Sequence, residues 1–239
     1  MAKESGLNVR LYVEGKDMSG SANALSGAGY SQAMLETTPL NTSAATRITG
    51  LADGTLSVNG YFDTSDDAPW AEDSGKLPSS DAVVLVALSS AVGDPSVGMN
   101  AKEGEFNVSR SSGSAISIAS SFSGNGMGGE FGEMLTAHDD THSSAGSGTV
   151  VDSGASSSSG GAGYVQVISL GSGSVVVNLQ ESTSSGGSYS NFMTFSTVAA
   201  AAAPSAERVT MEGTVQRYIK VVTTGTFSNA KIAVAFARF

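Results

Sequence analysis

Residues 214–239 read TVQRYIKVVTTGTFSNAKIAVAFARF, and they contain two runs in which the side chains alternate in character. In the first run Ile219 and Val221 lie on one face, and in the second run Ile232, Val234 and Phe236 do. A period of two with β-branched and aromatic residues is typical of half-buried β-strands. The Thr, Gly, Ser and Asn residues between the runs predict a turn. We therefore expect an antiparallel hairpin here and an all-β fold.

The composition agrees with an all-β fold. Only 14% of the 239 residues are charged, 40% are hydrophobic, and there are 30 glycines. This mixture suits short strands and turns better than surface helices, which need Glu, Lys, Arg and Leu. The chain has no cysteine, which excludes disulfides and thiolate metal sites.

No targeting or membrane segment is expected. The N-terminal residues have no apolar core of the kind found in signal peptides. No apolar run approaches the roughly 20 residues that span a bilayer. We expect a soluble product that is synthesised in the host cytoplasm.

The charge is distributed unevenly. Residues 1–142 carry eighteen acidic and seven basic residues, which gives −11, whereas residues 143–239 carry four acidic and five basic residues, which gives +1. Such asymmetry predicts two domains. The acidic part also argues against direct nucleic-acid binding, because Lys and Arg are needed to replace phosphate counterions.

Further strands are expected on both sides of a Ser/Gly-rich tract. The stretch 48–62 predicts a strand, a turn at Asp53 and Gly54, and a second strand in which Leu56 and Val58 face a core. The apolar run 82–88 predicts a strand that is buried on both faces. The other expected strands cover residues 7–13, 106–109, 115–122, 130–135, 164–170, 174–181, 191–196 and 208–211.

The Ser/Gly-rich tract at 143–163 predicts a linker or loop, in which residues 149–152 could form a short strand. Fourteen of its 21 residues are Ser or Gly, a composition that gains little by ordering. We therefore expect an N-terminal β-sandwich or barrel at 1–142, a linker at 143–163, and a C-terminal jelly-roll-like β-sandwich at 164–239.

An acidic connection at 63–81 holds the single tryptophan of the chain. It is too polar for a core and too long for a hairpin turn, so it either moves freely or orders against a neighbouring chain. An aromatic side chain within a charged rim suits an interface anchor. The candidate inter-subunit contact residues are Asp63, Asp66, Asp67, Trp70, Glu72 and Asp73.

The sequence indicates neither catalysis nor a cofactor. His138 and His142 flank two aspartates, but a solvated loop explains them better than a metal site. Gly124, Gly126 and Gly129 match the spacing of a dinucleotide loop without the helix that such a site needs, so we expect a turn. No serine lies in a nucleophile motif.

Several stretches resemble the major tail (tail tube) proteins of long-tailed bacteriophages, particularly those with an extra C-terminal β-domain. The similar segments include LYVEGKDMSG near the start, RITGLADGTLSVNGYFD, VALSSAVGDP and the closing RYIKVVTTGTFSNAKIAVAFARF. The resemblance implies a tail-tube-type β-sandwich or barrel. It also implies hexameric rings that stack into a tube, with loops and hairpins bridging subunits.

The resemblance implies a structural virion protein of the tail whose partners are copies of itself and other tail proteins. DNA would pass the acidic lumen without specific binding, since like charges repel. The alternative is a capsid decoration protein or a glycan-binding adhesion protein. In that case the C-terminal domain would bind a host-surface glycan by stacking on Tyr164, Tyr189, Phe192 or Trp70.

Overall fold

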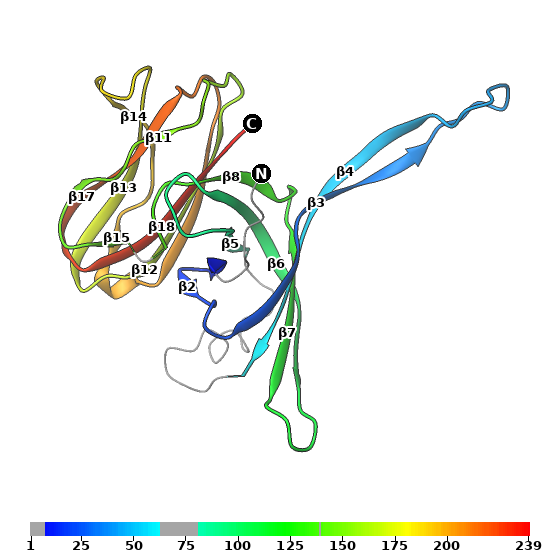
Figure 1. Cartoon of the computed structure of the whole chain (residues 1–239), viewed down its shortest axis with the longest axis horizontal. Helices are drawn as coiled ribbons and strands as arrows, with labels where there is room; N and C mark the ends of the chain where they lie inside the picture. The colour runs from blue at the N-terminus through cyan, green and yellow to red at the C-terminus, as the bar shows by residue number, and fades with distance from the viewer. Residues whose placement is uncertain (1–7, 63–80, 139) are drawn as a thin grey trace.

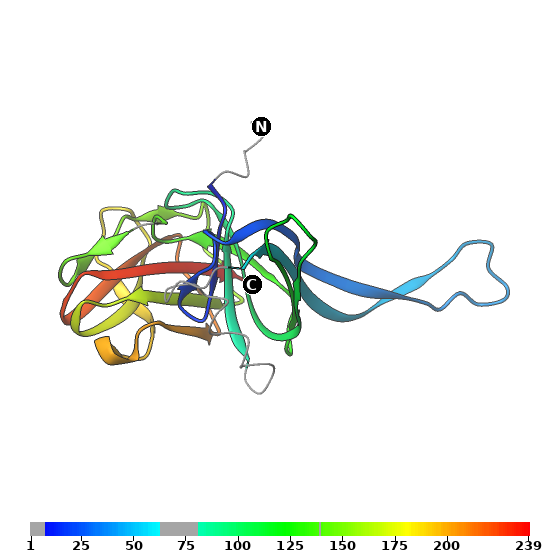
Figure 2. The same cartoon turned by 90° about the horizontal axis from the view of Figure 1, so that it is seen from below.

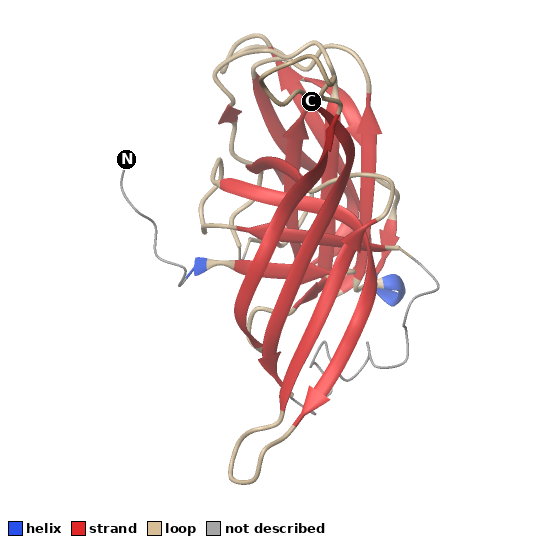
Figure 3. Ribbon diagram, turned by 90° about the vertical axis from the view of Figure 1, so that its right-hand side faces the viewer, coloured by secondary structure: helices blue, strands red, loops and turns tan. Residues whose placement is uncertain are grey.

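Among the described residues the regular structure is β-strand, apart from short turns of 3₁₀ helix such as η2 (Ala200–Ala202). The computed structural model describes residues 8–62, 81–138 and 140–239. Two sheets hold the described strands, one of twelve strands and one of six. Figure 1 shows a lobe of packed sheets from which a long two-stranded arm projects, and Figure 3 shows the strands that make up the lobe. The expectation of an all-β protein is confirmed.

The large sheet runs in the order β16-β12-β18-β8-β6-β5-β1-β2 and divides at β6, whose distal half pairs with β7, followed by β4 and β3. Its strands are β1 (Arg10–Val13), β2 (Lys16–Asp17), β3 (Ala22–Glu36), β4 (Arg47–Tyr61), β5 (Ala82–Ala87), β6 (Pro95–Ser109), β7 (Ser117–Gly124), β8 (Glu130–Met134), β9 (Thr141–His142), β12 (Gly161–Ser169), β16 (Ser205–Met211) and β18 (Ala230–Arg238).

The small sheet packs against one end of the large sheet. Its strands are β10 (Gly146–Ser147), β11 (Val151–Asp152), β13 (Ser172–Ser182), β14 (Ser190–Thr194), β15 (Val198–Ala199) and β17 (Tyr218–Ser228). The largest hydrophobic cluster lies between the two sheets and includes Leu179 and Val221 from the small sheet and Val165 and Val234 from the large sheet. This arrangement is a β-sandwich, as expected for the C-terminal part.

The prediction of a terminal hairpin is wrong, although the alternation behind it is correct. β17 pairs with β13 in the small sheet, whereas β18 pairs with β12 and β8 in the large sheet. Ile219 and Ile232 therefore line the same sandwich core from different sheets. A period of two gives the buried face of each strand, but it does not reveal whether consecutive strands pair or oppose each other.

The tract at 143–163 is not a linker or loop over its whole length, and the short strand expected within 149–152 is present as β11. Two short strands of the tract, β10 and β11, pair with β17, and Val151 in β11 is buried. The last residues of the tract, from Gly161, belong to β12. Its glycines allow close packing: a Cβ atom on Gly163 would lie 2.9 Å from the Phe195 ring. At its C-terminal end, Gly160, Gly161 and Gly163 therefore serve close packing, whereas Gly146 and Gly154 have open space around them.

The expected division at the tract does not separate the sheets. β18 pairs with β8, with Ala235 opposite Met134, so the large sheet joins the two halves of the chain. The Gln166 side chain strengthens this junction, because its amide donates to the Val83 carbonyl and accepts from the Gly15 amide. The two-domain division stays a prediction, with a continuous sheet between its parts.

The central strand β5 is buried on both faces, as predicted. Val84 and Val86 belong to the core beneath β1, β4 and β7. Val83 and Leu85 pack on the opposite side, against the alanines of β18 and against Tyr164 of β12. The protein therefore has three successive cores, with β5 and β18 between them.

The predicted turn at Asp53 and Gly54 is wrong. Both residues lie within the continuous strand β4, which pairs with β3 along its length. The chain instead reverses at residues 37–46, where the Thr37 amide donates to the Thr46 carbonyl at 2.9 Å. Gly54 is needed for close packing, since a Cβ atom there would lie 2.8 Å from the Gly129 nitrogen. The predicted core positions Leu56 and Val58 are confirmed.

Candidate self-assembly surface

The most unusual surface of the protein is the projecting half of the β3–β4 hairpin, residues 30–53, which we call the distal arm. Figure 2 shows the arm leaving the lobe as a twisted ribbon with no other strand beside it. β4 pairs with β7 only from Thr55 inward, and nearly every residue of the distal arm is exposed. An isolated two-stranded ribbon is marginally stable in water.

The distal arm carries large apolar side chains that the rest of the described chain leaves largely exposed. Six of them are at least half exposed, and Leu40 at the tip is fully exposed, at 108%. These residues are Tyr30, Met34, Leu35, Leu40, Ile48 and Leu51. Apolar groups gathered on a projecting ribbon are typical of surfaces that become buried in an assembly.

Both faces of the arm contribute apolar side chains. Leu35 lies opposite Ile48 in the ladder, and cross-strand partners project from the same face. Met34 lies opposite Thr49 and therefore projects from the other face. A partner that covers only one face would leave apolar side chains exposed on the second face.

The arm also has an open sheet edge. Among the strands that the structure describes, β3 pairs only with β4, and its other edge has no partner over 15 residues. Long unpaired edges are templates for strand addition by another chain. A second, shorter hairpin of β6 and β7 projects from the same region, with its turn at 110–116 (Figure 1).

The sequence-based contact residues Asp63, Asp66, Asp67, Trp70, Glu72 and Asp73 lie outside the described residues. Their proposed contact role stays a prediction. The distal arm was not identified from the sequence. The available signal was the occurrence of Met34, Leu35, Leu40, Ile48 and Leu51 in a stretch that otherwise has few large apolar residues.

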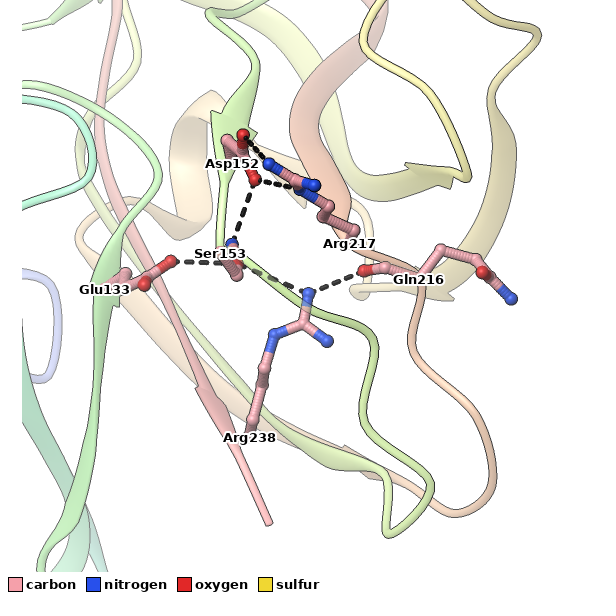
Figure 4. A network of polar contacts seen from close by, with 7 residues as sticks. Glu133, Asp152, Ser153, Gln216, Arg217 and Arg238 are labelled. Atoms are coloured by element: carbon pink, nitrogen blue, oxygen red, sulfur yellow. Dashed lines mark hydrogen bonds and ion pairs between the residues drawn. The ribbon is translucent and has the colours of Figure 1, made fainter.

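A network of hydrogen bonds near the C-terminus connects segments that are distant in the sequence (Figure 4). The Arg238 guanidinium donates to the Gln216 carbonyl at 2.6 Å and to the Ser153 hydroxyl at 3.3 Å, and that hydroxyl donates to Glu133 at 3.0 Å. Burial lowers the pKa of Arg238. These hydrogen bonds connect the end of β18 with β8 and with the loops at Ser153 and Gln216, so we assign the network a structural role.

An ion pair at the surface of this network is more exposed. Arg217 donates to both carboxylate oxygens of Asp152, at 2.6 and 2.8 Å (Figure 4). The hydrogen bonds from Arg217, followed by the one from the Gly154 amide, lower the pKa of Asp152 to about 2. Both side chains of the pair are 45% exposed.

Tyr164 is not available for glycan stacking, which corrects one of the sequence-based candidates. Its ring is 1% exposed and packs on Gly98, and its hydroxyl bonds Glu130. Arg208 completes a buried triad by donating to Glu130 at 3.1 Å and to the Tyr164 oxygen at 3.0 Å. Burial, followed by the charge of Glu130, raises the pKa of Tyr164 well above its ordinary value.

Two of the other aromatic candidates, Tyr189 and Phe192, contact side chains of the same chain. The Tyr189 ring lies under the Lys220 ammonium, 4.3 Å from its nitrogen. Phe192 makes an edge-to-face contact with Phe236, with the ring centroids 5.4 Å apart. Trp70 lies outside the described residues.

The described residues contain no group of three or more His, Cys, Asp or Glu side chains that could hold a metal ion. His138 is buried, and His142 lies 3.4 Å from Asp140. Gly126 and Gly129 lie in the connection between β7 and β8, as expected, whereas Gly124 is the last residue of β7. Within the described part of the chain, no helix has the length and apolarity required to cross a membrane.

The chain resembles known proteins in three-dimensional structure but not in sequence. No family model matches the chain. No curated protein matches it either.

Three solved structures resemble the fold. The first, from the virion of a native gene transfer agent particle, has 13% identity and a TM-score of 0.41, over 52% of this chain and 95% of that chain. The second is the tube-terminating cap of the anti-feeding prophage, with 8% identity and a TM-score of 0.44, over 55% and 91%. The third is the SPP1 Dit protein of a phage hub adsorption apparatus, with 10% identity and a TM-score of 0.37, over 97% and 99%. At these values, the likeness by itself assigns neither a family nor a function.

Proposed function

We propose that this chain is a structural virion protein of a phage tail. Copies of the chain form hexameric rings, and the rings stack into the tube through which DNA passes. The proposal combines the sequence resemblance to tail tube proteins with the architecture of the distal arm. Its partners are other copies of itself and neighbouring tail proteins.

The observation that carries the proposal is the exposed apolar surface of the distal arm. Six large apolar side chains lie at least half exposed on a two-stranded ribbon. At roughly 25 cal/mol per Å² of buried apolar surface, covering them with a neighbouring subunit stabilises an assembly substantially. A contact between a projecting arm and a different surface of the next copy is heterologous, and such contacts generate rings or filaments.

The charge distribution supports a role in conducting DNA. The arm and the strands around it belong to the acidic segment 1–142, which carries a formal charge of −11. A lumen lined by this segment would repel phosphates, so that DNA slides through and does not adhere. The nearly neutral segment 143–239 would lie on the outside of the tube.

The proposed role needs no catalytic chemistry and no cofactor. The side chains that it uses are apolar and exposed, and they act by being covered. The histidines and the buried Glu130, Tyr164 and Arg208 belong to the fold and have no part in the proposed mechanism.

The test uses sedimentation velocity across a concentration series, on the wild type and on an arm variant with Leu40→Ser and Leu51→Ser. Both positions are at least 92% exposed, so the substitutions remove no core contact. Val108→Ser is the matched control, because Val108 is also exposed, at 53%, but lies on the other hairpin. We expect large assemblies for the wild type and the control, and monomers for the arm variant.

Two results would contradict the proposal. One is a monomer at all concentrations, with or without a tail initiator complex. The other is assembly of the arm variant equal to that of the wild type. If the protein binds capsids or glycans but does not self-assemble, the result would instead favour a capsid decoration protein or a glycan-binding adhesion protein.

A further inference from the structure

The distal arm meets the lobe at a contact made of glycine backbones. We call Gly29, Gly54, Gly128 and Gly129 the glycine seat. A Cβ atom on Gly128 would lie 2.7 Å from the Tyr30 Cβ, and one on Gly129 would lie 2.5 Å from the Gly29 oxygen. These distances leave no room for a side chain. The loop 125–129 therefore touches the base of the arm through main-chain atoms.

The arm backbone is irregular at the same level. Ala28 and Gly29 both oppose Thr55, which is the pattern of a β-bulge, and the adjacent Gly27 has a φ of 71°. Bulges bend a strand and increase its local twist. The ladder of β3 and β4 continues outward from this point, from the pair of Tyr30 and Gly54 to the pair of Glu36 and Arg47, with one further irregularity near Met34.

Few side chains hold the arm at the seat. Tyr30 and Phe131 make an edge-to-face contact with their ring centroids 6.2 Å apart. Both rings remain mostly in solvent, at 60% and 55% exposed. Thr55 donates a hydrogen bond to the Gly27 carbonyl at 3.2 Å within the hairpin itself. Such a junction is close at the backbone but has few interlocked side chains to fix the orientation of the arm.

We propose that the glycine seat is a pivot on which the distal arm swings as a rigid two-stranded unit. The Tyr30–Phe131 contact holds one orientation of the arm. Glycine backbones slide without repacking of side chains, and hinges are short stretches that absorb changes in φ and ψ. The pivot is a property of a single chain. A test of the pivot can therefore fail or succeed independently of the test of self-assembly.

The experiment measures distances between pairs of spin labels by pulsed electron resonance in the full-length monomer. The chain has no cysteine, so labelled cysteines can be introduced in pairs without background. Ala44 and Ser185 report from the arm to the lobe, Ala91 and Ser185 report within the lobe, and Ala44 and Asp53 report within the arm. All these positions are exposed.

For a rigid arm on a pivot, we expect the arm-to-lobe distance distribution to be about twofold broader than the other two distributions. Phe131→Ala should broaden it further, because the contact that holds one orientation is lost. Gly128→Ala should shift its mean, because the added methyl group opens the seat. Gly186→Ala is the matched control, since a Cβ atom there meets nothing within 4 Å.

Three results would overturn the pivot. The first is an arm-to-lobe distribution as narrow as the one within the lobe, in the wild type and in Phe131→Ala. The second is a within-arm distribution as broad as the arm-to-lobe one, which means that the hairpin frays. The third is a mean distance that Gly128→Ala leaves unchanged. The Phe131 variant keeps the test decisive if Gly128→Ala fails to fold.

Discussion

The buried triad of Glu130, Tyr164 and Arg208 joins β8, β12 and β16 through charged and polar groups inside the large sheet. The side chains of Arg208 and Glu130 are only 10% and 13% exposed. Buried charges are tolerated when they are paired and hydrogen-bonded, and removing one partner leaves the other uncompensated. The triad therefore makes the stability of the sheet depend on all three residues at once.

The substitution Arg208→Met should destabilise the protein by about 3–5 kcal/mol, because it leaves the Glu130 carboxylate buried without its cation. Urea denaturation measures the free energy of unfolding. The double variant Arg208→Met, Glu130→Gln should recover much of the loss. The exposed pair provides the control: Arg217→Met should cost less than Arg208→Met. Equal losses for Arg208→Met and Arg217→Met would contradict the role of burial.

Tyr164 should make the protein sensitive to alkali. Its pKa in the folded state is raised above the ordinary value of 10.0 by burial and by Glu130. The folded state therefore retains a proton that the unfolded state releases, so stability is full below about pH 10 and falls as the pH rises further. The expected slope of this contribution is about 1.4 kcal/mol per pH unit.

Denaturation measured from pH 8 to 12 tests this dependence, and Tyr164→Phe should flatten the alkaline decline. Tyr189→Phe is the control, because Tyr189 is only half-buried, whereas Tyr164 is fully buried, and it should contribute less. A decline in Tyr164→Phe as steep as in the wild type would show that another group governs the alkaline transition.

At the scale of elements, the distal arm and β5 differ most in how far their residues are buried. β5 is buried on both faces, whereas the distal arm is exposed on both faces and both of its edges lack a partner among the described strands. Segments with few buried contacts open at low free-energy cost, and buried strands open only with global unfolding. The arm is therefore the element whose state should change most on assembly.

Hydrogen exchange measured by mass spectrometry should distinguish these two elements. In the monomer, we expect amides of residues 31–52 to exchange at least about a hundredfold faster than those of β5. On assembly, the arm amides should become protected, while β5 stays unchanged as the internal control. An arm that is already protected in the monomer, or one that remains unprotected in the assembly, would exclude its burial by a neighbour.

The sequence predicts individual strands better than their partners. Alternation correctly assigns the buried faces of Leu56, Val58, Ile219 and Ile232, because burial on one face imposes a period of two. Pairing depends on distant contacts, so the terminal strands were expected in one hairpin and instead lie in two sheets. Glycine contributed to the other errors, because Gly54 and the glycines at 160, 161 and 163 serve close packing here.

At the scale of the whole molecule, the large sheet connects regions that differ in charge. β18 lies between β12 and β8, so the last strand of the chain stabilises strands of both halves. The buried Gln166 amide and the glutamate of the triad add polar links at the same junction. The halves differ in electrostatics, and one hydrogen-bonded sheet unites them.

This continuity predicts cooperative unfolding. Differential scanning calorimetry of the monomer should show one transition, with a calorimetric enthalpy equal to the van't Hoff enthalpy. Leu85→Ala in β5 and Val234→Ala in β18 should both lower the midpoint of that same transition, since both residues are completely buried. Two separate transitions, each shifted by only one of the variants, would instead indicate independent domains.

The central claim is that copies of this chain assemble through their arms into stacked rings, and electron microscopy of the purified wild-type protein at high concentration tests it most directly. The account predicts tubes of uniform width and end views with sixfold symmetry, both of which are absent from the Leu40→Ser, Leu51→Ser variant. Micrographs that show only separate monomers, or identical tubes from the arm variant, would contradict it.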